Sequence, residues 1–114
     1  MNPQKVVREK IRYFTDLPNI GAAAARDFEV LGFIEPSQLI GADPLHLYES
    51  LCLVTSTRHD PCVLDVFMSV TDFLAGGEPK PWWHFTELRK RSTAVCQRLL
   101  WASRNRAWQA APSD

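Results

Sequence analysis

The sequence lacks long apolar runs and lacks the alternation of apolar and polar residues that marks β-strands. Its apolar runs fall far short of the roughly 20 residues that cross a bilayer. The N-terminal stretch "MNPQKVVREK" has no apolar core of the kind found in secretion signals. We therefore expect a cytoplasmic protein without a membrane segment. Because strand signals are poor and helix-breaking residues are frequent, the sequence predicts an all-α fold.

Cysteine is scarce, and the usual catalytic patterns are missing. Cys52, Cys62 and Cys96 are odd in number and lack the spacing of a disulfide framework or a structural zinc site. The chain has no phosphate-binding Gly-Lys loop, no Ser-His-Asp order and no paired-carboxylate signature. We therefore expect no metal, no cofactor and no enzymatic activity.

Charge of one sign is missing from each of two regions. The formal net charge is zero, which argues against strong nonspecific binding to nucleic acid. Between Asp27 and Glu78 the only lysine or arginine is Arg58, whereas from Lys80 to Trp108 the only acidic residue is Glu87. This segregation could serve complementarity within the chain or between subunits, or form a basic binding face.

The sequence does contain many residues that typically begin or end helices. Pro3 can open a first helix that continues to Phe14, and a second helix is expected over residues 21–31 with Gly32 just past its end. A short helical turn is expected at "EPSQLI". Two Asp-Pro pairs, Asp43-Pro44 and Asp60-Pro61, predict two further helix starts, because aspartate caps a helix and proline fits its first position.

The helix after Asp60 has the clearest apolar stripe, which places it at the centre of the core; the stripe comprises Val63, Val66, Phe67, Val70, Phe73 and Leu74. Asp65 and Asp72 share another face of this helix, and we expect that face to be solvated. Trp82, Trp83 and Phe85 are expected to cover the core. Thr86 should cap a basic C-terminal helix over about residues 86–108.

The stretch "LPNIGAAAA" predicts a tight turn into a closely packed helix. Pro18 fixes the entry, and Asn19 can adopt the positive φ that most residues avoid. Ile20 is expected to enter the core. Gly21 allows close approach to the start of the helix, where exposed N–H groups can bind a phosphate.

This stretch resembles the hairpin of a helix-hairpin-helix motif. With "LYESLC", "RHDPCVLDVF" and "PWWHFTE", the chain is similar to the pathogenicity-locus family of small bacterial helix-hairpin-helix proteins, some of which carry a mitomycin-resistance label. The resemblance covers roughly residues 17–87 and implies an all-α fold of the sterile-alpha-motif-like type. We expect a single domain over residues 1–114, a bundle of five or six helices. The resemblance implies no catalytic activity.

The resemblance also indicates a non-catalytic, DNA-associated accessory role. The contacts would come from the hairpin backbone at Asn19, Ile20, Gly21 and Ala22, with Arg26 and the basic C-terminal helix assisting. DNA-binding versions of the hairpin often carry a lysine where this chain has Ala23, so affinity for nucleic acid is expected to be weak. The alternative is that the hairpin is only a compact packing unit.

Two other features carry alternative hypotheses. Cys62 follows a capped helix start near Arg58 and His59, which would lower its pKa and make it a reactive thiol, unless it is simply a small buried residue.

In the C-terminal helix, Arg104 lies between Trp101 and Trp108 at helical spacing. Such a face could grip single-stranded bases, complete the core, or mediate protein contacts, including self-association into a homodimer.

Overall fold

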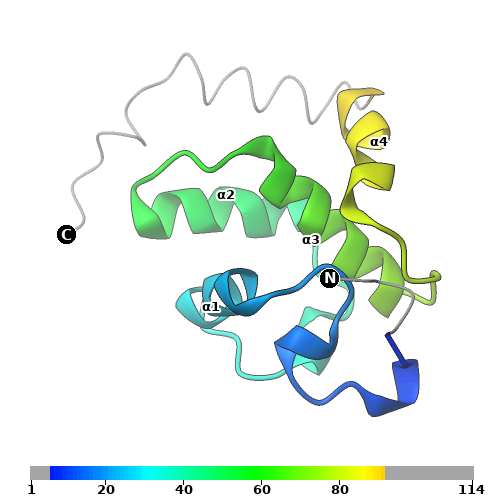
Figure 1. Cartoon of the computed structure of the whole chain (residues 1–114). Helices are drawn as coiled ribbons and strands as arrows, with labels where there is room; N and C mark the ends of the chain where they lie inside the picture. The colour runs from blue at the N-terminus through cyan, green and yellow to red at the C-terminus, as the bar shows by residue number, and fades with distance from the viewer. Residues whose placement is uncertain (1–5, 92–114) are drawn as a thin grey trace.

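The computed structural model describes residues 6–91, and within that range the chain is all-α, with no strand (Figure 1). This confirms the predicted fold class. Four α-helices follow one another along the chain: α1 (Ala22–Val30), α2 (Pro44–Thr55), α3 (Pro61–Leu74) and α4 (Thr86–Arg91). Short 3-10 turns occupy Arg8–Lys10, Phe14–Asp16, Pro36–Leu39 and Trp82–Phe85.

The expected first α-helix is wrong for the part of it that the structure describes. Residues 6–16 form two 3-10 turns, separated by extended backbone at Ile11. The Asp16 carboxylate accepts hydrogen bonds from the backbone N–H groups of Arg12 and Tyr13 at 2.9 and 2.8 Å. These bonds favour a local turn over a continuous helix because they satisfy donors that an α-helix would bind to carbonyls. The described residues therefore hold fewer α-helices than the five or six expected.

Both Asp-Pro helix starts are confirmed. The Asp43 carboxylate accepts from Leu45 N–H at 3.0 Å at the start of α2, and the Asp60 carboxylate accepts from Cys62 N–H at 2.8 Å at the start of α3. Each carboxylate satisfies a first-turn donor that has no partner within the helix. The proline that follows each aspartate occupies the first helical turn.

Helix α3 is the centre of the core, as its apolar stripe predicts. Leu64, Phe67 and Val70 are completely buried. The Phe67 ring lies 5.2 Å from the Phe28 ring of α1, measured between centroids. Helix α3 also packs along α2 and against the Trp82–Phe85 turn, so it touches most of the other elements (Figure 1).

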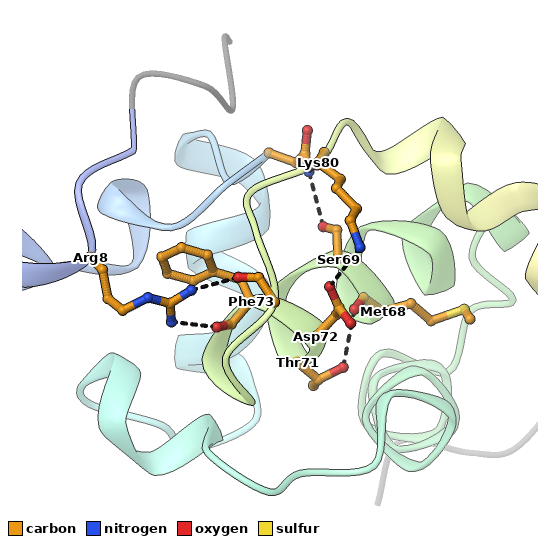
Figure 2. Close-up of polar contacts among 9 residues, drawn as sticks. Arg8, Met68, Ser69, Thr71, Asp72, Phe73 and Lys80 are labelled. Atoms are coloured by element: carbon orange, nitrogen blue, oxygen red, sulfur yellow. Dashed lines mark hydrogen bonds and ion pairs between the residues drawn. The ribbon is translucent and has the colours of Figure 1, made fainter.

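The Arg8 side chain, from the N-terminal segment, contacts the C-terminal end of α3. The Arg8 guanidinium donates to the carbonyl oxygens of Phe73 and Gly77 at 2.6 and 2.5 Å (Figure 2). It also lies 4.0 Å from the centroid of the Phe73 ring. A cation is favourable there because the last carbonyls of a helix carry partial negative charge.

The connector between α3 and α4, residues 75–85, covers the core only in part. Phe85 is buried as expected, but Trp83 is 62% exposed. Thr86 is the first residue of α4, and its hydroxyl donates to the Asp65 carboxylate at 2.7 Å. The Asp65 side chain is buried beneath this contact. This corrects the expectation of a solvated acidic face at Asp65. The rest of the expected C-terminal helix, with Trp101 and Trp108, lies outside the described residues.

Candidate nucleic-acid interface

The turn before α1, residues 17–21, occupies the place of the predicted hairpin, is called the hairpin below, and is built into the core. Leu17, Pro18 and Ile20 are each no more than 2% exposed. Asn19 adopts a φ of 65°, as predicted for the position where the motif often has glycine. Its side-chain amide donates to Ser69 Oγ at 3.0 Å and to the Lys80 carbonyl oxygen at 2.7 Å. Asn19 thus fastens the hairpin to α3 and to the connector before α4.

The start of α1 differs from the starts of α2 and α3. Gly21 is the N-cap residue, with extended backbone, and no side chain of the described residues hydrogen-bonds to this helix start. Ala22 and Ala23 are exposed. The first N–H groups of an α-helix have no partner within the helix, and they carry partial positive charge. The first turn of α1 therefore presents backbone donors beside small side chains.

The predicted contact residues divide into two groups. Gly21, Ala22 and Arg26 lie at the surface, wholly or in part. Asn19 and Ile20 are buried, with exposed fractions of 7% and 1%. Their side chains hold the turn in shape, so a ligand at this site would meet the backbone of the hairpin and the Arg26 side chain.

Positive charge around the hairpin is limited. Arg26 is followed by Asp27, whose pKa is raised by burial and lowered in part by His59 nearby. Lys80 reaches the hairpin through its backbone, while its ammonium group lies 3.5 Å from Asp72 (Figure 2). Ser69 and Lys80 both support the hairpin, but neither could be identified from the sequence because each is at least 50 residues away from Asn19.

The environment of Cys62 contradicts the lowered pKa expected for it. The pKa of the Cys62 thiol is raised, first by its hydrogen bond to the Asp60 side chain, then by burial and by the negative charges of Asp60 and Asp65. The nearby Arg89 opposes this only in part. The carboxylate that caps α3 therefore disfavours the thiolate.

Residues 6–91 lack both a cluster of metal ligands and a membrane-spanning helix. No group of three or more His, Cys, Asp or Glu side chains is arranged to hold a metal ion there. In the same range, none of the helices combines the length and apolar character needed to span a bilayer.

The fold and the site together define a small all-α domain with a clamped hairpin that leads into a helix without a side-chain cap. Residues 7–91 match the pathogenicity-locus family (Cdd1), and the chain belongs to this family. It is 45% identical over 80 residues to the mitomycin resistance protein McrB of Streptomyces lavendulae, a match that covers 70% of this chain and 76% of that protein. No solved structure matches the chain. The family suggested by the sequence is confirmed.

Proposed function

We propose that the chain is a non-catalytic protein of the helix-hairpin-helix kind that binds nucleic acid through the hairpin before α1. The observation that carries this proposal is the start of α1. It has no side-chain cap and exposes Ala22 and Ala23, whereas carboxylates occupy the corresponding positions of α2 and α3. A phosphate oxygen can accept from backbone N–H groups at such a helix start.

The small side chains support the same proposal. A phosphate needs close approach to the backbone, and glycine and alanine at residues 21–23 leave room for it. Arg26, one turn further along, supplies the cation of the site. Because one backbone site and one arginine neutralise few phosphates, we expect weak binding with a shallow dependence on salt.

The name of the Streptomyces lavendulae relative associates that protein with mitomycin resistance. We propose the same phenotype for this chain. Growth of cells with and without the protein in the presence of mitomycin measures it directly.

Two substitutions at one position test the binding site itself. Ala23→Lys adds the cation that DNA-binding hairpins often have, and Ala23→Glu adds a charge that repels phosphate but favours the start of a helix. We expect Ala23→Lys to tighten binding to labelled DNA several-fold and Ala23→Glu to abolish it, with both variants folded. Titrations of single- and double-stranded DNA at low and moderate salt measure the effect.

The matched control is Lys10→Ala, which removes an exposed cation from the N-terminal 3-10 turn. Arg26→Ala should lower the slope of log affinity against log salt by about one, while Lys10→Ala should leave it unchanged. If Ala23→Lys and Ala23→Glu bind DNA equally, the hairpin is not the site. A stable dimer that ignores DNA would favour the alternative function, a protein-interaction module.

A further inference from the structure

A groove with apolar walls lies between α1 and the 3-10 turn Phe14–Asp16. It has a volume of about 500 Å³; its lining includes Tyr13, Phe14, Ala25, Glu29, Phe33 and Ile34. Tyr13 is 70% exposed and Ile34 is 84% exposed, and Val30, next to Glu29 on α1, is 45% exposed. Large apolar side chains gathered in this way are typical of a surface that binds another protein segment.

The charge of the groove restricts what can occupy it. Glu29 is the one charged residue in its lining, and its side chain is exposed. A carboxylate within an apolar wall favours an occupant that combines large apolar side chains with a cation. A polyanion such as DNA would be repelled by Glu29, so this groove is distinct from the site proposed at the start of α1.

The chain itself contains a segment with the required chemistry. Its sequence continues for 23 residues beyond Arg91, and these residues lie outside the described part. Trp101 and Trp108 flank Arg104 there, with Arg98 and Arg106 close by, and no acidic residue occurs from residue 88 to residue 113. Tryptophan and arginine are the residues most enriched at the energetic centres of protein interfaces.

We propose that residues 98–108 of a second copy of this chain bind in this groove, with arginine facing Glu29 and tryptophan against the apolar walls. A second copy fits better than the same copy because of where the elements lie. Helix α4 packs on α3 and on the Trp82–Phe85 turn, and its Arg89 is bonded to Asp65. Helices α1 and α4 lie on opposite sides of α3 in the view of Figure 1. Only six residues separate Arg91 from Arg98, which span at most about 25 Å.

Sedimentation of the full chain over a range of concentrations, without DNA, tests this proposal. We expect the wild type to dimerise and Ile34→Glu, Glu29→Lys and Trp101→Ala each to raise the dimer dissociation constant at least tenfold. Ile34 and Glu29 are exposed, so these substitutions should leave the helical circular dichroism unchanged. Glu9→Lys is the matched control, because it reverses an exposed charge in the N-terminal 3-10 turn and should leave dimerisation unchanged.

A charge exchange identifies the contact. Arg104→Glu should weaken the dimer, and Glu29→Lys combined with Arg104→Glu should restore at least part of the lost affinity. A wild type that stays monomeric at all concentrations would overturn the proposal. So would a dimer that Trp101→Ala disrupts while Ile34→Glu and Glu29→Lys do not, since the segment would then bind elsewhere. Since no DNA is present, failure here is independent of the outcome at the hairpin.

Discussion

Asp65 and Asp72 lie on the same helix, seven residues apart, yet their surroundings differ greatly. The Asp65 side chain is completely buried, and its carboxylate accepts from Arg89 Nε at 2.7 Å and from the Thr86 hydroxyl at 2.7 Å. The Asp72 side chain is 38% exposed and faces Lys80 at 3.5 Å. Its Oδ2 atom is buried and accepts no hydrogen bond within the described residues.

The difference shows that the residues brought against a helix decide whether a carboxylate on it is solvated. Spacing places Asp65 and Asp72 on one face of α3. The connector and α4 then cover the middle of that face with Thr86 and Arg89, which satisfy the buried charge. At the end of the helix the Lys80 ammonium group faces the Asp72 carboxylate at 3.5 Å. The two aspartates should therefore differ strongly in their contribution to stability.

The largest expected effect is at Asp65. Asp65→Ala should lower the free energy of unfolding by about 3–5 kcal/mol, because it removes the buried carboxylate that forms an ion pair with the largely buried Arg89. Arg89→Ala should cost a similar amount, since it leaves the carboxylate buried and unpaired. Denaturant titrations of both variants measure these losses.

A double substitution separates the ion pair from simple loss of packing. Asp65→Leu combined with Arg89→Met replaces the pair with apolar groups of similar size and should recover most of the lost stability. If Asp65→Ala costs no more than Asp72→Ala, the contrast between the two positions fails.

Much of the fold could be predicted from local signals in the sequence. The caps at Asp43 and Asp60, the stripe on α3 and the end of α1 at Gly32 all depend on residues close together in the chain. Gly32 has a φ of 94°, and the bond from Phe33 N–H to the Phe28 carbonyl closes the helix as expected. These elements follow from backbone geometry and apolar periodicity alone.

What could not be predicted depends on contacts between distant segments. The Asp65 carboxylate is satisfied by residues 21 and 24 positions later. Arg8 reaches the end of α3 across 65 residues. At the candidate site, the positive φ of Asn19 followed from the motif, but the acceptors of its amide did not. Apolar periodicity indicates which face of a helix is buried but does not identify the polar partners that meet it.

The next largest effect is expected at Gly77. A Cβ atom at this position would lie 2.3 Å from Asp72 Oδ2 and 2.9 Å from the Asp72 carbonyl oxygen. Gly77→Ala should therefore lower the free energy of unfolding by about 1–3 kcal/mol, because the backbone must shift. Adding Asp72→Ala removes the side-chain clash but not the backbone one, so only part of the loss should be recovered. Thermal unfolding of the single and double variants would show this, and complete recovery would contradict the backbone clash.

A smaller effect is expected at Asp60, the aspartate that caps the start of α3. Its pKa is lowered, chiefly by the hydrogen bond from Cys62 N–H. The cap therefore contributes fully at pH values above the pKa of the unfolded chain, near 4, and its contribution is lost as the pH falls through the lower pKa of the folded state.

Asp60→Ala should cost about 1 kcal/mol at neutral pH, and this difference from the wild type should shrink below pH 4. Asp60→Asn is the control, because asparagine caps a helix nearly as well but does not titrate over this range. Urea titrations from pH 7 to pH 2 measure both. A loss from Asp60→Ala that stays constant over the whole range would argue that the carboxylate charge plays no part in the cap.

The smallest effect is expected at Asp72, and it completes the comparison with Asp65. The Lys80 ion pair is more than one-third exposed on both sides, so solvent screens it, and pairs of this kind contribute about 0–1 kcal/mol. Asp72→Ala removes Oδ2, the oxygen that faces Lys80; this atom is buried and accepts no hydrogen bond among residues 6–91, so its removal offsets part of the lost attraction. We therefore expect Asp72→Ala and Lys80→Ala to change the free energy of unfolding by less than about 1 kcal/mol. A larger loss in Asp72→Ala would mean that Lys80 or a bound water stabilises Oδ2 more strongly than its exposure implies, and the contrast with Asp65 would then be weaker.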